Sequence, residues 1–249
     1  MLKTRTSQLA LAALVVLGAA MPAHAQTYGD GFLFHQPYAR ISLRGGYAVA
    51  RAGSDVFDFT TENLTLKKSD FSGLSLGAAF DLTITSRVAL TVDAGYSRSS
   101  KGSEFRKLID NNNLPIEQRT TFERVPLTVN VKYYLSSPGQ SIGSAAWIPA
   151  KVTPWIGAGA GTVHYRFKQE GDFVDFQTNN VFLSTFDSKA WAPAMQGMAG
   201  ADFTLTPALA LTGEARYLWA KADLSRDFGG FDKIDLSGLS ASIGLSIRL

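Results

Sequence analysis

The chain ends with the sequence ASIGLSIRL, residues 241–249, in which an apolar residue stands at every second position: Ile243, Leu245, Ile247 and Leu249. Strict alternation of apolar with small or polar residues indicates a β-strand that presents one apolar face. A free C-terminus usually frays beyond its last strand. Here the final residue belongs to the apolar row itself, so we expect the last strand to be paired along its whole length.

The same alternation recurs along the chain, most clearly in RVPLTVNVKYYL, residues 124–135. One row of this segment comprises Val125, Leu127, Val129, Val131, Tyr133 and Leu135. The other row contains Arg124, Thr128, Asn130, Lys132 and Tyr134. A helix would mix these two rows, whereas a strand separates them onto opposite faces. We identify eight such segments, each of about 10 to 16 residues, and predict an all-β fold of eight antiparallel strands.

Two architectures use eight such strands: a soluble sandwich with its apolar faces inside, and a transmembrane barrel with its apolar face in lipid. The aromatic residues of the apolar rows distinguish them, because they gather near the strand ends. We assign to one end Tyr38, Phe80, Tyr133, Trp155 and Phe203, and to the other Tyr96, Phe167, Trp191 and Trp219. Two aromatic belts are typical of a barrel whose amphipathic side chains lie at both membrane interfaces.

The predicted connections alternate between long and short. Long polar stretches cover residues 52–69, 100–120, 168–188 and 226–234, whereas the chain turns quickly at residues 83–87 and 206–207. Outer-membrane barrels have long outer loops and short periplasmic turns. We therefore predict an eight-stranded antiparallel transmembrane β-barrel with long outer loops and mostly short periplasmic turns. Residues 136–151 are an exception, and we expect Trp147 and Ile148 in this connection to dock at the inner membrane surface.

Residues 1–25 have the features of a secretory signal peptide. Lys3 and Arg5 precede an apolar run over residues 9–20, and a small-x-small cleavage site follows at residues 23–25. A retained transmembrane helix is the alternative, but the run is shorter than the roughly 20 residues that a bilayer requires. We predict a barrel domain over residues 26–249, of which residues 26–37 form a periplasmic N-terminal segment.

Composition excludes several classes of function. The chain contains no cysteine, so it has neither disulfide bonds nor thiol chemistry. Its formal net charge of +3 includes the two basic residues of the predicted signal peptide, and an almost neutral exported domain is not expected to bind nucleic acid. The sequence contains no pattern that predicts a metal site or a cofactor site.

The C-terminal motif Ser242-x-Gly244-x-x-Ile247-x-Leu249 resembles the signal by which outer-membrane barrels are recognised for insertion. Together with the strand pattern, it makes the chain similar to the superfamily of small eight-stranded barrels that includes the OmpA transmembrane domain, OmpX and OmpW. This resemblance implies an outer-membrane location, contact with membrane lipid and lipopolysaccharide, assembly by the barrel-insertion machinery, and a monomer. Members of the superfamily usually end on an aromatic residue, so Leu249 predicts less efficient insertion.

The polar rows predict a charged barrel interior. We assign to this lumen charge network Arg40, Arg44, Asp81, Asp93, Arg124, Lys132, His164, Arg166, Asp202, Glu214, Arg216 and Arg248. An eight-stranded barrel is about filled by its side chains, and buried charges require partners. We therefore predict a plugged lumen in which Glu214 pairs with Arg44, and Arg216 is the competing partner.

Three functions are compatible with this fold. The first is a role in outer-membrane integrity or in surface interaction through the loops, and the second is a narrow channel for small or hydrophobic molecules, as the resemblance to OmpW implies. The third is a lipid A-modifying enzyme, which needs a histidine near a serine on the outer surface. The candidate histidines are His35 in the N-terminal segment and His164, which we predict to face inward. Because that direction is wrong for catalysis, we predict that the protein is not an enzyme.

The terminal motif leads to a first prediction. Deleting Leu249, or replacing it with Asp, should leave unfolded chain in the periplasm, because the final side chain must be apolar for insertion and then lie in lipid. Leu249→Phe should assemble at least as well as the parent. Heat-modifiable electrophoretic mobility of membrane fractions measures assembly, and normal assembly of the Asp variant would refute this use of the motif.

Overall fold

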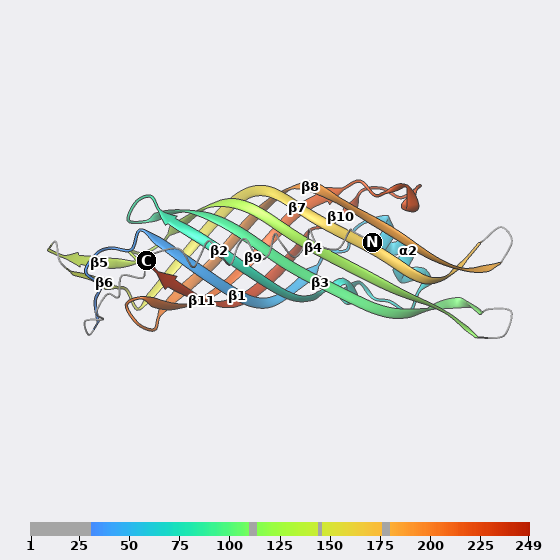
Figure 1. Ribbon diagram of the computed structural model, residues 1–249, viewed down its shortest axis with the longest axis horizontal. Coiled ribbons are helices and arrows are strands. Elements are labelled where there is room, and N and C mark those ends of the chain that lie inside the picture. The colour runs from blue at the N-terminus through green and yellow to red at the C-terminus, as the bar shows by residue number, and fades with distance from the viewer. Residues whose placement is uncertain (1–30, 110–113, 144–145, 176–179) are drawn as a thin grey trace, which may run out of the picture. The chain divides into compact units, whose positions relative to one another are not determined.

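The computed structural model describes residues 31–109, 114–143, 146–175 and 180–249. The predicted signal peptide and the first part of the predicted N-terminal segment lie outside these residues. The eight long strands of the described chain are β1 (Ala39–Ala50), β2 (Gly73–Thr83), β3 (Val88–Ile109), β4 (Pro115–Tyr134), β7 (Val152–Val174), β8 (Val181–Thr204), β9 (Leu209–Ala222) and β11 (Gly238–Arg248). They pair in this order as one antiparallel ring, which β11 closes on β1 (Figure 1). The predicted eight-stranded barrel is confirmed.

The seam between β1 and β11 uses the C-terminal row that was predicted to be paired. Its register runs from Arg40 opposite Arg248 to Ala50 opposite Gly238. Leu249 then completes it, because its N–H donates to the carbonyl of Ala39 at 2.9 Å and its carbonyl accepts from the N–H of Tyr38 at 3.1 Å. The last residue of the chain is therefore part of the barrel wall.

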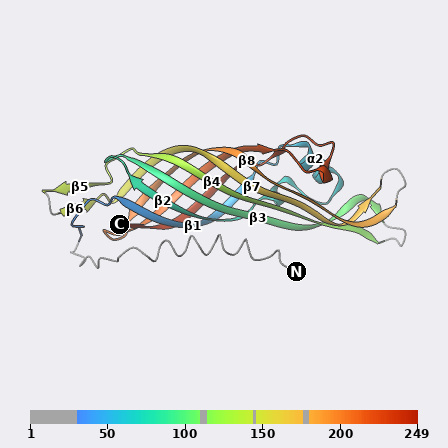
Figure 2. The same ribbon diagram turned by 45° about the horizontal axis from the view of Figure 1, so that its top comes forward.

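Two hairpins extend well beyond the ring at its outer end. Strands β3, β4, β7 and β8 contain 22, 20, 23 and 24 residues, and β4 pairs with β7 as far as Gln118 and Gly171. They form a four-stranded projection, which Figure 2 shows tapering away from the ring. The predicted polar loops over residues 100–120 and 168–188 were thus largely wrong, because most of these residues continue the strands.

The other two outer connections fold inward. The connection after β1 contains helix α2 (Asp55–Asn63) and the short helix η1 (Lys68–Phe71). The connection after β9 contains the short helix η2 (Arg226–Phe228) and strand β10 (Ile234–Asp235), which pairs with β9. Phe57, Phe71, Phe228 and Ile234 of these segments are all buried in one apolar cluster with residues of the barrel wall.

The periplasmic end is also covered. Strands β5 (Gly139–Ile142) and β6 (Ala146–Pro149) form a small hairpin, and Leu33 of the N-terminal segment pairs with Trp147. Trp147 is buried in a cluster with Leu33 and Ala208, so the expectation that it docks on the membrane was wrong. The guanidinium of Arg248 lies over its indole ring, 5.7 Å from the ring centroid. Ile148 remains exposed.

Strand β7 faces the opposite way from the prediction. Trp155, Val163, Tyr165 and Phe167 were assigned to the lipid face, but all four are buried inside the barrel. Small residues at the alternate inward positions make room for this packing. A Cβ atom on Gly159, for example, would lie 2.3 Å from the side-chain oxygen of Asn130 on β4. Trp155 and Phe167 therefore do not belong to the predicted aromatic belts.

Among the described residues, no helix is both long and apolar enough to span a membrane.

Candidate functional site

The barrel lumen is the candidate functional site, and its periplasmic third contains a lower ion network. Arg40 of β1 forms an ion pair with Asp202 of β8, and Lys132 of β4 forms one with Asp81 of β2 at 3.0 Å. Hydroxyl groups complete the coordination of both carboxylates: Thr91 donates to Asp81 at 2.6 Å, and Thr212 donates to Asp202 at 2.8 Å. The indole N–H of Trp155 also donates to Asp202, at 3.3 Å. One set of contacts thereby joins β1, β7, β8 and β9, and a second set joins β2, β3 and β4.

A central quartet of two arginines and two acids lies next along the barrel. Asp93 of β3 accepts from Arg44 at 2.8 Å and from Arg216 at 2.7 Å. Glu214 of β9 pairs with the same two arginines, at 3.0 Å from Arg44 Nε and 2.7 Å from Arg216 Nη2. Ser242 of β11 donates a further hydrogen bond to Glu214 at 3.1 Å. Each acid thus bridges both cations, and the quartet is electrically neutral.

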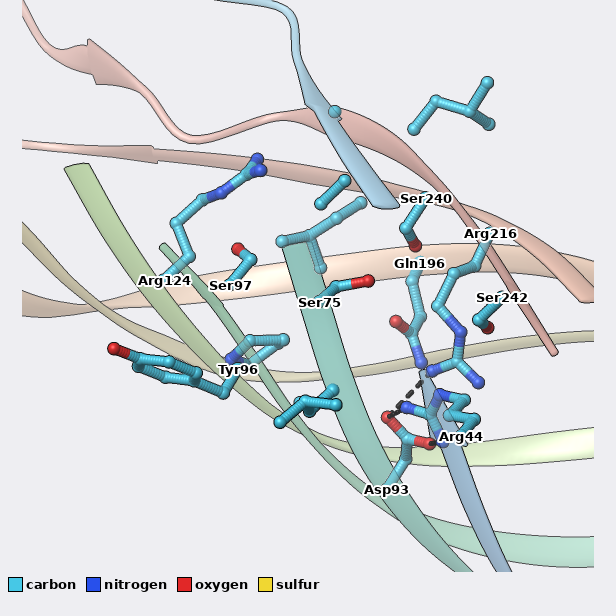
Figure 3. Close-up of a pocket in the computed structure, with 17 residues that line it drawn as sticks. Arg44, Ser75, Asp93, Tyr96, Ser97, Arg124, Gln196, Arg216, Ser240 and Ser242 are labelled. Atoms are coloured by element: carbon cyan, nitrogen blue, oxygen red, sulfur yellow. Dashed lines mark hydrogen bonds and ion pairs between the residues drawn. The ribbon is translucent and has the colours of Figure 1, made fainter. Parts of the chain in front are cut away.

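A cavity with both polar and apolar lining lies beside the quartet on its outer side. Its volume is about 60 Å³, which is room for several waters. Arg44, Asp93 and Arg216 border it on one side and Arg124 on the other, as Figure 3 shows. The remaining polar lining comprises Gln196 and the hydroxyl groups of Ser75, Ser97, Ser240 and Ser242.

An apolar cap closes the outer end of the lumen above this cavity. Phe57 of α2 is completely buried and packs edge-on against Phe71, Phe122 and Phe167, with ring centroids 4.6, 5.4 and 5.6 Å away. Phe228 of η2 packs on Phe167 at 5.3 Å. The hydroxyl group of Tyr165 anchors the connection after β9, because it donates to the carbonyl of Asp223 at 2.6 Å. We define these residues as the cap.

The structure places most of the predicted lumen charges inside the barrel. The lower ion network brings together Arg40, Asp81, Lys132 and Asp202, and the central quartet brings together Arg44, Asp93, Glu214 and Arg216. The predicted pair of Glu214 with Arg44 exists alongside the competing contact with Arg216. Arg124 and Arg248 are buried near the two ends of the network.

His164 and Arg166 were placed wrongly, because both face outward from β7. The ring of His164 packs against exposed Trp191 with centroids 5.1 Å apart. Arg166 makes two hydrogen bonds of 2.9 Å with the carboxylate of Asp187 on β8. These bonds hold the pKa of Asp187 below its usual value. The argument that His164 points the wrong way for lipid A chemistry therefore fails, but its ring makes no hydrogen bond to a serine of the described chain.

The physical reason for this error is a reversal of polarity along the outer wall. Within the membrane the outer face meets lipid, so apolar residues point outward. Beyond Trp191 the outer face meets water and the inner face meets the cap, so charged residues point outward and aromatic ones inward. A prediction that places the apolar row outward along the whole strand therefore assigns inward and outward residues the wrong way round beyond this level. The charges at Arg166, Lys168 and Glu170 were the available sequence signal for the change.

The outer surface identifies the environment of the barrel. Between the two ends of the ring, large apolar side chains are exposed on seven of the eight strands and partly exposed on β9, and Leu74 reaches 77% exposure. Exposed aromatic residues flank them: Tyr38, Tyr133 and Phe203 at the periplasmic end and Tyr96, Trp191 and Trp219 at the outer end. A soluble protein rarely exposes an apolar surface of this extent. The protein is an outer-membrane β-barrel.

Comparisons with known proteins do not define a function. No protein-family model matches the chain, and no curated protein matches it. The chain is similar in structure to OprG of Pseudomonas aeruginosa, with 15% identity and a TM-score of 0.47 over 87% of this chain and 99% of that one. Neisserial surface protein A is 11% identical, with a TM-score of 0.45 over 85% of this chain and 96% of that one. OmpW of E. coli is 17% identical, with a TM-score of 0.42 over 86% of this chain and 100% of that one. Similarities at this level support no inference about activity.

The central quartet leads to a second prediction. Glu214→Ala should lower the free energy of unfolding by about 3 to 5 kcal/mol, because it leaves two buried arginines with one acid. Glu214→Ala combined with Arg216→Ala should recover part of this loss, since the neutral pair of Arg44 and Asp93 remains. Exchanging Arg44 and Glu214 should not recover this loss of stability, because each moved charge would meet a like charge. Urea unfolding in liposomes, followed by tryptophan fluorescence, measures these differences.

Glu123→Ala is the matched control for this series. Glu123 forms an ion pair with Arg98 at 3.2 Å on the outer face, where Arg98 is largely exposed. Exposed pairs contribute about 0 to 1 kcal/mol. An equal loss of stability in Glu123→Ala and Glu214→Ala would contradict the special role of the buried quartet.

Proposed function

We propose that this protein is a closed outer-membrane barrel that contributes to membrane integrity or presents its outer hairpins to surface partners, and that it does not conduct solutes. The observation that supports this proposal is the series of obstructions along the lumen. Trp147 and the lower ion network occupy the periplasmic part, the central quartet occupies the middle, and the cap occupies the outer part. A solute would have to displace both paired charges and a packed apolar cluster.

The cap is a strong barrier because it is packed as a core. Burial of a phenylalanine side chain contributes about 1.5 to 3 kcal/mol, and edge-to-face ring pairs add about 0.5 to 1.5 kcal/mol each. Phe57 makes three such ring contacts in the cap. Opening the outer end therefore requires helix α2 to leave its site, a larger change than the rotation of one side chain.

The outer hairpins are the parts of the described chain best exposed to a partner. Arg98, Glu123, Arg166 and Lys189 form one row across β3, β4, β7 and β8, immediately beyond the level of Tyr96 and Trp191. Charged groups at this height suit the phosphorylated head groups of outer-membrane lipid and lipopolysaccharide. Farther out, Leu183 is 81% exposed on β8 and offers an apolar contact. We expect the protein to act as a monomer and to meet the insertion machinery during assembly through Ser242, Gly244, Ile247 and Leu249.

The alternative function is a narrow channel for small or hydrophobic molecules, and conductance distinguishes it. The refolded parent should give no steady current in a planar bilayer, and Glu214→Ala alone should remain nearly silent because the cap is intact. Glu214→Ala combined with replacement of residues 54–66 by a short glycine-serine linker should conduct. A parent that conducts steadily, with a current that neither change alters, would favour the channel.

A complementation experiment separates the two roles of a closed barrel. A strain lacking the protein would receive either the parent or a variant whose hairpins are shortened symmetrically at Ser100–Thr121 and Lys168–Asp187, which are paired positions in the register. If the barrel supports membrane integrity, the shortened variant should restore resistance to detergent as well as the parent does. Restoration by the parent alone would assign the role to the hairpins, and restoration by neither would contradict a role in integrity.

A further inference from the structure

The charges inside the lumen do not balance one another. Four lumen acids, Asp81, Asp93, Asp202 and Glu214, are all engaged by Arg40, Arg44, Lys132 and Arg216. Two further buried arginines, Arg124 and Arg248, have no carboxylate within ion-pair distance in the described parts of the chain. A buried charge without a counter-charge at ion-pair distance is unfavourable. The lumen therefore favours the uptake of negative charge.

Arg124 is the better placed of these two cations. Its side chain projects from β4 between the cap and the cavity, and the residue is 5% exposed. Its Nη1 atom donates to the carbonyls of Leu236 and Ser237 at 3.0 and 3.4 Å. A guanidinium group has five N–H donors, so Nε and Nη2 retain donors that no acceptor of the described chain engages.

The cavity beside Arg124 supplies additional donors. The hydroxyl groups of Ser75, Ser97 and Ser240 line it and make no hydrogen bond to another described residue. Across the cavity, Asp93 is already held by Arg44 and Arg216, which offsets its repulsion of an anion. The nearest other acid is buried Asp235, which attracts Arg124 from beyond ion-pair distance; its carboxylate accepts from the N–H of Ser237 at 3.0 Å and lies 3.8 Å from largely exposed Arg51.

Arg248 is less suited to binding a ligand. Its guanidinium donates to the carbonyl of Pro207 at 3.0 Å and to the hydroxyl group of Thr204 at 2.8 Å; it also lies over the ring of Trp147, as Arg124 lies over the ring of Phe122. The neighbouring cavity has a volume of about 30 Å³, half that of the cavity at Arg124. It contains no comparable set of unengaged serine hydroxyl groups.

We propose that the central cavity is a binding site for a small oxyanion of the size of phosphate, held by the guanidinium of Arg124 and the hydroxyl groups of Ser97 and Ser240. Charge-assisted hydrogen bonds from a guanidinium to an oxyanion are short and strong, and serine hydroxyl groups donate to the remaining oxygens. The anion also neutralises a cation that the fold leaves buried at the base of the cap. This site is independent of whether the lumen conducts ions.

Urea unfolding of the refolded full barrel tests this site, with inorganic phosphate as the probe. Ionic strength is held constant with gluconate, which is too large for the cavity. Phosphate should stabilise the parent, with about a tenfold decrease in the unfolding equilibrium constant when its concentration is about ten times the Kd. Arg124→Gln should abolish this response, and Arg98→Gln, which removes an exposed arginine of similar height, should retain it.

A second variant keeps the test decisive if Arg124→Gln does not fold. Ser97→Ala combined with Ser240→Ala removes two donors and no charge, and it should shift the phosphate response to at least tenfold higher concentration. Absence of a response in the parent would overturn the proposal. So would an equal response in the parent and in Arg124→Gln, or, where that variant is unfolded, an unchanged response in the double serine variant.

Discussion

The pairing of β1 with β11 is the constraint on which the rest of the structure depends. In lipid no water is present to bond an exposed N–H or carbonyl group, so a sheet is stable there only if it has no edge. The seam runs from Arg40 opposite Arg248 to Ala50 opposite Gly238, and Leu249 extends it by two more hydrogen bonds. The register of the last strand therefore determines the barrel, including which residues of every strand can face inward.

Closure with eight strands makes the interior narrow, and this explains the chemistry inside. Side chains from opposite walls meet, so long charged residues pair across the axis while small residues stand beside them. Gly77 is the partner of Arg44 on β2, and a Cβ atom there would lie 2.5 Å from the guanidinium carbon of Arg44. Arg44 can reach both Asp93 and Glu214 because this neighbour has no side chain. The quartet is thus a product of small residues as much as of charged ones.

The continuity of long strands through two environments explains the cap. Strands β4, β7 and β8 leave the lipid but remain paired, and their inner faces then enclose a space that no membrane surrounds. Apolar residues such as Phe122 and Phe167 fill it together with α2 and η2. The same strand is therefore polar inside and apolar outside at one height, and the reverse at another. Arg124 lies at the boundary between these two interiors, where no described carboxylate is within ion-pair distance and Asp235 attracts it from farther away.

The sequence by itself determined the number of strands, the membrane-facing rows of all strands except β7, the pairing of the C-terminal strand to its last residue, and most of the lumen charges. The reason is that in a strand with a two-residue period the apolar row must face the lipid, so the other row must face the lumen. Residues 124–135 and 241–249 were assigned correctly from this period alone. Only the tertiary structure decided that Asp93 joins Arg44 and Arg216 and that Arg40 pairs with Asp202, since these residues come from strands that are distant in sequence. It also decided the orientation of Trp155, His164 and Phe167, because the inward direction of β7 depends on packing against the cap and on neighbouring strands rather than on the residues of β7 themselves.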